Sequence, residues 1–289
     1  MKEKISLIGG DLRIVNLAQM MQKDGKDILV YGMEHSEEIM GNENILKAKT
    51  LDEAIENSNI IIGSIPFASD DNKMYATFSE KDIKIEDLVK KNNKSKKFIA
   101  GSINEKSYKL LSSSYGGVID VMKREELVIL NTIATAEGAI EVAIRNTDTI
   151  LLGSKVLVLG FGRVGKVVAR KFYELSAKVT CAARRKTDLA WIRAFGYDDV
   201  DINTLGKDLN KYDIIINTVP QIIINKDLMK YMKKDVLMID LASNPGGINR
   251  EHAKELDLKL VWALALPGKV APVTSAHFIK ETIYNVLSE

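Results

Sequence analysis

Short apolar runs alternate with amphipathic helical stretches along the whole chain, and this alternation constrains the fold more than any other feature. The runs are four to six residues long and many are continuously apolar, for example Ile5–Ile8, Ile28–Tyr31 and Val156–Leu159. Such runs are typical of strands that are covered on both faces. Alternation of strands with helices predicts parallel sheets flanked by helices. We therefore expect a fold of the α/β class.

Both halves of the chain begin with the same unit, which is a strand, a glycine turn, a helix and a second strand. The turn starts at Gly9 and at Gly160, and the second strand starts at Ile28 and at Val179, so both features are displaced by the same 151 positions. A chain of 289 residues also exceeds one domain of about 150 residues. We therefore predict two Rossmann-like domains with parallel sheets, joined by a helix, with a cleft between them.

The expected domain boundaries follow from this repeat. Residues 1–130 would form the first domain and residues 131–289 the second. The joining helix is predicted over 131–147, with Asn131 or Thr132 as its N-cap. The last helix, 275–289, either belongs to the second domain or packs back on the first.

Composition argues against several classes of protein. The chain has 41 Lys and Arg against 39 Asp and Glu, whereas a nucleic-acid binder would have an excess of basic residues. The lone cysteine, Cys181, cannot form an internal disulfide or a zinc site built from cysteines. No apolar run approaches the ~18 residues of a membrane span, and the N-terminus leads straight into a strand-like segment without a signal peptide. We expect a soluble cytoplasmic protein that binds no metal.

The glycine turn of the second half matches the pattern G-x-G-x-x-G. It directly follows the predicted strand Lys155–Leu159 and opens an apolar-periodic helix, and in this context the pattern predicts a dinucleotide site. The first glycine allows a tight turn, the second lets the backbone approach the diphosphate, and the third lets the helix pack closely on the strand. Free N–H groups at the helix start favour the diphosphate. The predicted contacts are Gly160, Phe161, Gly162, Arg163, Val164 and Gly165.

The end of the next strand indicates which dinucleotide binds. An NAD site usually carries Asp or Glu there, about 20 residues on, to hold the ribose 2′-OH. Here Ala183 is followed by Arg184, Arg185 and Lys186. Arginine suits a 2′-phosphate because its planar fork offers several charge-assisted hydrogen bonds. We therefore predict NADP(H) rather than NAD(H), the alternative being a solvated basic turn.

Further cofactor contacts are expected from the later strands and the joining helix. Residues 218–220 follow a predicted strand at the position where dehydrogenases commonly contact the nicotinamide ribose. Glu137, on the joining helix, would reach the same ribose, but it would equally suit a solvent-exposed helix face. Loop 242–247 either binds a carboxylate, borders the nicotinamide or is simply a tight turn. The predicted contacts are Thr218, Val219, Pro220, Thr135, Glu137, Asp240 and Ala242.

The glycine turn of the first half differs from that of the second. Asp11 and Ile14 stand where the second and third glycines would be, so we expect no second dinucleotide there. The loop still lies at the edge where open α/β sheets bind ligands. Arg13 would clamp a substrate carboxylate, or Asp11 and Arg13 would cap the helix and pair with each other.

Seven segments that extend over nearly the whole chain carry a resemblance to a known family. In chain order they are Gly9–Arg13, Asn131–Gly138, Gly160–Gly165, Ala183–Arg184, Ile216–Pro220, Asp240–Gly247 and Leu266–Thr274. They occur in the same order in the family that they resemble, the A subunit of dipicolinate synthase in spore-forming bacteria. The glycine fingerprint is shared with many dehydrogenases, whereas the last two segments are specific to this family.

This resemblance implies oxidation of dihydrodipicolinate, or of its 4-hydroxy-tetrahydro precursor, to pyridine-2,6-dicarboxylate. It also implies a flavoprotein-like partner, the B subunit of dipicolinate synthase, and a role in the mother cell during sporulation, and we expect a homo-oligomer. The substrate-binding residues it suggests are Asp11, Arg13, Asn131, Ser243, Asn244, Gly246, Gly247, Pro267, Gly268, Lys269 and Thr274.

The chain departs from the family pattern at three positions. Asn244 stands where a relative has Arg, Ala265 replaces a Gly, and Val273 replaces a Lys. If the lost cations hold a substrate carboxylate in the family, Lys269 and Arg13 are the candidates for that role here.

We identify no acid–base residue. Of His35, His252 and His277, only the last lies near a motif, and surface or core roles are expected for all three. Two other functions remain open: an NADP-dependent dehydrogenase of another small carboxylate, and a regulatory protein that senses NADP(H) without turnover.

Overall fold

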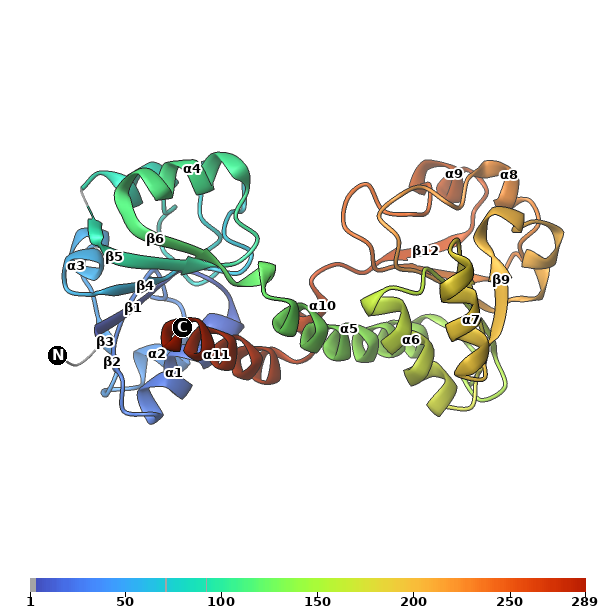
Figure 1. Ribbon diagram of the computed structural model, residues 1–289, viewed down its shortest axis with the longest axis horizontal. Coiled ribbons are helices and arrows are strands. Elements are labelled where there is room, and N and C mark those ends of the chain that lie inside the picture. Colours follow the sequence, from blue (N-terminus) through green and yellow to red (C-terminus); the bar gives the residue numbers. More distant parts are fainter. Residues whose placement is uncertain (1–3, 71, 92) are drawn as a thin grey trace. The chain divides into compact units, whose positions relative to one another are not determined.

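The computed structural model describes residues 4–70, 72–91 and 93–289, and the chain divides into two compact units. The first comprises Met1–Leu130 and Ala271–Glu289, and the second comprises Asn131–Val270. Within the described residues, each unit contains one six-stranded parallel sheet with helices on both faces (Figure 1). The expected α/β fold with two Rossmann-like parallel sheets is confirmed.

The first sheet has the order β3-β2-β1-β4-β5-β6. Its strands are β1 (Lys4–Ile8), β2 (Asp27–Tyr31), β3 (Leu46–Lys47), β4 (Ile60–Ile62), β5 (Asn93–Ala100) and β6 (Tyr115–Asp120). The helices of this unit are α1 (Leu12–Lys23), α2 (Glu37–Met40), α3 (Leu51–Glu56), α4 (Glu105–Ser114) and α11 (Pro272–Ser288).

The second sheet has the matching order β12-β11-β10-β7-β8-β9. Its strands are β7 (Lys155–Leu159), β8 (Lys178–Ala183), β9 (Asp198–Asp201), β10 (Ile214–Asn217), β11 (Leu237–Asp240) and β12 (Lys259–Trp262). The other helices are α5 (Glu125–Asn146), α6 (Arg163–Glu174), α7 (Lys186–Ala194), α8 (Lys226–Met229), α9 (Arg250–Glu255) and α10 (Leu266–Val270).

The internal repeat persists in the register of the sheets. Lys4 of β1 pairs with Asp27 of β2, and Lys155 of β7 pairs with Lys178 of β8. Side chains of successive strand residues lie on opposite faces of the sheet and pack into different cores, as expected for strands covered on both faces. In β7, for example, Val156 and Val158 belong to one buried cluster, whereas Leu157 and Leu159 belong to another.

Helix α11 belongs to the first unit, where it lies along α1 (Figure 1). Lys280 and Tyr284 both donate to Asp24 at 2.8 Å, and Arg124 binds Glu289 through two hydrogen bonds. These contacts hold α11 on the first unit. It begins earlier than expected, with Pro272 in its first turn.

Helix α5 begins at Glu125, six positions before the predicted start, so Asn131 and Thr132 lie inside the helix and neither is its N-cap. Glu125 and Glu126 occupy the first turn, where acidic groups are favoured by the helix dipole. Gly138, also inside α5, gives close access to α10, because a Cβ atom there would lie 3.0 Å from that of Leu266.

By length and composition alone, α5 is apolar enough to cross a membrane, which differs from the sequence expectation. Its mean hydropathy is 1.6 over an 18-residue window, of which 44% is buried. Glu137 and Glu141 lie within this helix. Because core helices of soluble proteins have the same composition, α5 by itself is weak evidence for a membrane segment.

Ala265 is one of four non-glycine residues in the described chain with a positive φ, at 57°. We expect Ala265→Gly to raise the free energy of unfolding by about 0.5–1 kcal/mol, because a side chain in this conformation costs about 1–2 kcal/mol, partly offset by the entropy of glycine. The free energy of unfolding is measured by denaturant unfolding followed by tryptophan fluorescence. Ala190→Gly, in the middle of α7, should lower the stability instead, and a loss of stability in both variants would contradict the prediction.

Candidate functional site

The glycine turn of the second unit connects β7 to α6 at the carboxyl edge of the sheet. Gly160 has a φ of 92°, and a Cβ atom there would lie 2.6 Å from the Val219 side chain and 2.7 Å from Thr218 Oγ1. At Gly165 a Cβ atom would lie 2.1 Å from the Gly160 carbonyl oxygen. Both positions therefore require glycine, the first for the turn and the second for close contact between helix and strand.

Gly162 has a different environment. It is the N-cap of α6, and a Cβ atom there would meet nothing within 4 Å. Glycine at this position therefore leaves open space at the start of a helix, where N–H groups favour a phosphate. The three glycines together fit a bound dinucleotide.

Phe161 is 3% exposed, and its ring lies 6.2 Å from that of Phe195 and 6.5 Å from that of Tyr197. Val164 packs against the same core cluster. Of the six residues predicted in the turn, these two pack their side chains against the core and so help to anchor α6.

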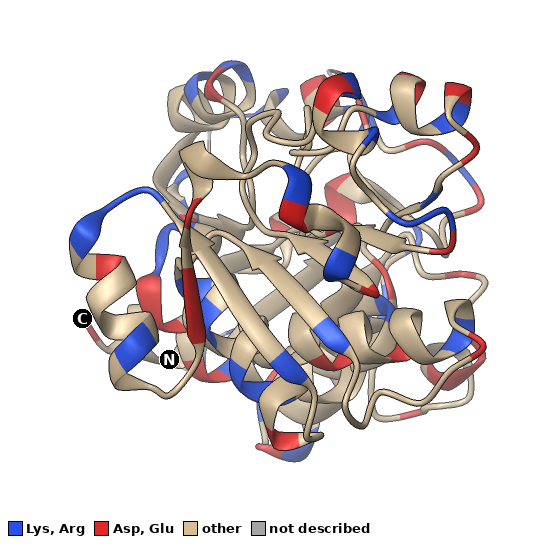
Figure 2. Cartoon of the chain, turned by 90° about the vertical axis from the view of Figure 1, so that its right-hand side faces the viewer, with Lys and Arg blue, Asp and Glu red and all other residues tan. Residues whose placement is uncertain are grey.

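The three cations after β8 differ in their partners. Arg185 forms two hydrogen bonds to Asp188, at 2.8 and 3.0 Å, and Lys186 pairs with Asp201 at 3.1 Å. Among the described residues, Arg184 is exposed and has no carboxylate partner. Figure 2 shows basic and acidic residues interspersed along the chain, in line with the near-neutral composition.

Asp201 is a neighbour that the sequence did not reveal. Strand β9 pairs with β8 so that Asp201 lies opposite Ala183. The backbone N–H of Asn203, followed by the Lys186 side chain, lowers the pKa of Asp201. An acid is therefore present beside the basic turn, on the adjacent strand rather than at the end of β8, and Lys186 balances its charge.

Hydrogen bonds made by side chains of the loop and of the last β10 residue fix the loop after β10. Thr218 donates its hydroxyl to the Leu159 carbonyl oxygen at 2.8 Å. The buried Asn217 side chain accepts from Val219 N–H at 3.1 Å and donates to the Val219 carbonyl at 2.9 Å. Pro220 is exposed. This loop is therefore rigidly held against the start of the glycine turn.

Asp240, predicted to bind the cofactor, is 1% exposed and holds loop 242–247. One carboxylate oxygen accepts from Asn217 Nδ2 at 2.7 Å and from Ala242 N–H at 3.0 Å. The other accepts from Gly247 N–H at 2.7 Å and from Ile248 N–H at 3.1 Å. Both oxygens are thus used within the protein, and residues 243–245 are exposed at the tip of the loop.

The remaining predicted cofactor contacts lie on α5. Thr135 donates its hydroxyl to the Asn131 carbonyl at 2.9 Å, and Glu137 forms an ion pair with Lys171 of α6 at 3.3 Å. Glu137 is therefore an exposed helix residue whose charge is paired with a basic residue of α6.

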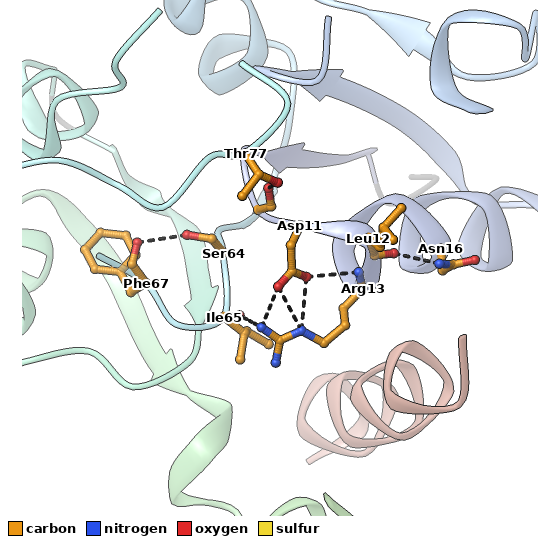
Figure 3. Close-up of polar contacts among 9 residues, drawn as sticks. Asp11, Leu12, Arg13, Asn16, Ser64, Ile65, Phe67 and Thr77 are labelled. Atoms are coloured by element: carbon orange, nitrogen blue, oxygen red, sulfur yellow. Dashed lines mark hydrogen bonds and ion pairs between the residues drawn. The ribbon is translucent and has the colours of Figure 1, made fainter. Parts of the chain in front are cut away.

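In the first unit, Asp11 caps the N-terminus of α1 and pairs with the Arg13 side chain (Figure 3). Asp11 accepts from Arg13 N–H at 3.0 Å, and the guanidinium binds both Asp11 oxygens and the Ile65 carbonyl. The Arg13 side chain is 8% exposed. Gly10 N–H donates to the Tyr75 carbonyl at 2.8 Å, so another loop covers this glycine turn.

Three of the other predicted substrate residues, Pro267, Gly268 and Lys269, form part of α10 in the second unit. Asn131 lies within α5, and Thr274 lies in the first turn of α11 in the first unit.

Cys181 and His277 do not have the surroundings of a catalytic group. Cys181 is buried in β8, and this burial raises the pKa of its thiol to about 12, so it is no nucleophile near neutral pH. His277 lies 3.4 Å from Glu281 on the exposed side of α11. Among the described residues, no group of three or more His, Cys, Asp or Glu side chains is arranged to hold a metal ion.

Comparison with known proteins gives a match in each unit. Residues 4–122 match the N-terminal domain of the dipicolinate synthase A subunit, and residues 131–251 match the NAD binding domain of D-isomer specific 2-hydroxyacid dehydrogenases. The dipicolinate synthase A subunit from Bacillus subtilis (strain 168) is 29% identical over 99% of this chain and 96% of that protein.

Solved structures give the same result. The crystal structure of the dipicolinate synthase A subunit from Bacillus halodurans has a TM-score of 0.91 and 29% identity, covering 100% of this chain and 99% of that one. L-alanine dehydrogenase has a TM-score of 0.67 at 13% identity, covering 98% of this chain and 88% of that one, which shows a likeness of fold alone.

The fold, the glycine turn and these matches define the class: an NAD(P)-dependent oxidoreductase with a nicotinamide dinucleotide site in its second unit. Within this class the chain is similar over nearly its whole length to the A subunit of dipicolinate synthase. The resemblance indicated by the sequence motifs is therefore confirmed.

Proposed function

We propose that the protein forms pyridine-2,6-dicarboxylate by oxidising dihydrodipicolinate, or its 4-hydroxy-tetrahydro precursor after loss of water, with NADP+ as acceptor. The observation that carries this proposal is the glycine turn with open space at Gly162, in a chain that is similar over 99% of its length to the A subunit of dipicolinate synthase.

In the proposed reaction, one C–H bond of the dihydropyridine ring breaks and its hydride passes to the nicotinamide of NADP+. A second ring hydrogen leaves as a proton, and the pyridine ring forms. Because aromatisation favours the products, the protein mainly has to orient the reactants and bind charge. The turn at Gly160–Gly165 holds the diphosphate, and the fixed loops after β10 and β11 border the nicotinamide.

The preference for NADP+ rests on Arg184, which is exposed at the end of β8 without a carboxylate partner among the described residues. We expect Arg184→Ala to raise the Kd for NADP+ at least about tenfold, because a hydrogen bond to a charged group contributes about 1.5–3 kcal/mol. The Kd for NAD+ should stay the same, as isothermal titration calorimetry would show. Arg193→Ala, an arginine of α7 paired with Asp199, is the control. Tighter binding of NAD+ than NADP+ by the unmodified protein would contradict this choice.

We also propose a partner subunit and a cellular location on the basis of the similar proteins. Because their name describes one part of a synthase with more than one kind of chain, it supports a flavoprotein-like B subunit of dipicolinate synthase in the role of partner. We also propose that this chain forms a homo-oligomer. The same resemblance supports a role in the cytoplasm of the mother cell during sporulation.

The direct test incubates the purified protein with freshly generated dihydrodipicolinate and NADP+, with and without the B subunit. Pyridine-2,6-dicarboxylate and NADPH should appear in equal amounts. NADP+ binding without any product, even with the partner present, would overturn the proposal in favour of a regulatory sensor. NADPH formation only with other small carboxylates would favour the alternative function, an NADP-dependent dehydrogenase of another small carboxylate.

A further inference from the structure

A second feature lies at the carboxyl edge of the same sheet, beyond loop 242–247. Arg250 is the first residue of α9, which follows this loop, and Trp262 is the last residue of β12. The Arg250 guanidinium carbon lies 3.9 Å from the centre of the Trp262 ring. This edge is the one on which open α/β sheets bind their ligands.

Trp262 also contacts the loop itself. Its Nε1–H donates to the Ala242 carbonyl at 2.9 Å, and a Cβ atom on Gly246 would lie 3.7 Å from the same nitrogen. The edge of the ring is therefore fixed to loop 242–247, while its face carries Arg250. The tryptophan thus holds the guanidinium beside the loop that we place next to the nicotinamide.

The described part of the chain does not neutralise the charge of Arg250. Within residues 4–70, 72–91 and 93–289, Arg250 has no carboxylate partner, and it is exposed. It lines a groove of about 350 Å³ in which Lys254 and Asp257 are the other charged residues. Because these two charges offset each other, Arg250 leaves the groove with a net positive charge and room for an anion.

The stacked geometry suits a carboxylate in particular. A guanidinium that lies on an aromatic ring keeps its N–H donors directed outward along its edges, and its planar fork matches a carboxylate with two parallel hydrogen bonds. The stack also restricts the side chain before the ligand arrives, which lowers the entropy lost on binding.

We propose that Arg250, held on the ring of Trp262, binds one carboxylate of the substrate and thereby selects for a dicarboxylate. This inference rests on the proposed function for the identity of the ligand. It gives the second unit its own carboxylate contact, since the Arg13 guanidinium in the first unit is engaged by Asp11 and Ile65.

The test is equilibrium dialysis of the full-length protein with labelled pyridine-2,6-dicarboxylate in the presence of saturating NADP+. We expect Arg250→Met to raise the Kd for this ligand at least about tenfold, with the Kd for NADP+ unchanged. Arg250→Lys keeps the positive charge but loses the planar fork of the guanidinium, so its Kd should lie between those of the wild type and Arg250→Met. Arg145→Met, which removes an exposed arginine of α5 paired with Glu141, should bind like the wild type.

A second measurement locates the ligand. The chain has two tryptophans, so Trp191→Phe leaves Trp262 as the sole reporter, and its fluorescence should change on binding of the dicarboxylate. Wild-type affinity in Arg250→Met, an equal loss in Arg145→Met, or no binding by the wild type would each overturn the inference. Binding that depends on Arg250 in a protein that forms no product would leave the inference standing and refute the proposed function alone.

Discussion

Replacing Asp240 with Asn is expected to lower the free energy of unfolding of the second unit by about 3 kcal/mol. Each oxygen of this buried carboxylate accepts two hydrogen bonds. An amide would place an NH2 group against two donors, whichever way it is turned, and would leave them unsatisfied. Because this unit holds loop 242–247 through Asp240, the substitution should also weaken dinucleotide binding.

Both tryptophans, Trp191 and Trp262, lie in the second unit, so denaturant unfolding followed by tryptophan fluorescence reports on that unit. The matched control is Asp227→Asn, because the Asp227 side chain is 81% exposed and pairs with Lys230 on the surface. We expect a change of less than about 0.5 kcal/mol there. Equal stability of the Asp240→Asn and Asp227→Asn variants would contradict the role given to Asp240.

Two alanine substitutions in the glycine turn should distinguish residues needed for stability from residues needed for NADP+ binding. Gly162→Ala adds a methyl group where nothing lies within 4 Å, so the unit should keep its stability to within about 1 kcal/mol, the scale of an N-cap change. The methyl group would occupy the space required by the diphosphate. We expect the Kd for NADP+ to rise about 100-fold, which corresponds to about 2.7 kcal/mol.

Gly165→Ala should affect both properties. Its Cβ atom would lie 2.1 Å from the Gly160 carbonyl oxygen, which is backbone and can move only if α6 shifts away from the strand. We expect lower stability as well as weaker NADP+ binding, measured by tryptophan-monitored unfolding and by calorimetric titration. Wild-type NADP+ affinity in Gly162→Ala would show that the diphosphate does not lie at this turn.

Local patterns in the sequence were enough to predict much of the fold and to locate the glycine turn of the candidate site. The apolar runs became strands buried on both faces, because alternate residues such as Val156 and Leu157 enter different cores. The glycine turn could be recognised because its chemistry depends on residues next to one another in the chain.

Contacts between segments far apart in the chain could not be predicted from local sequence patterns. Asp201 lies opposite Ala183 only because β9 pairs with β8. Likewise, the sequence suggested Asp240 as a cofactor ligand, whereas the fold surrounds its carboxylate with donors from Asn217 and from its own loop. The proposed role of Arg250 depends on Trp262, twelve positions later, whose place under the guanidinium follows from the packing of α9 on β12.

The α/β class, the repeated halves and the glycine turn could thus be read from the amino-acid order, because strand periodicity and turn geometry are set by neighbouring residues. The position of α11 in the first unit required the folded chain, since an amphipathic helix can bury its apolar face against either sheet. Folding also separates charged groups that are used internally, such as Arg13 with Asp11, from those that remain available to a ligand, such as Arg184 and Arg250 among the described residues. This separation cannot be read from the chain alone, because the energy of a charge depends on the groups folded around it.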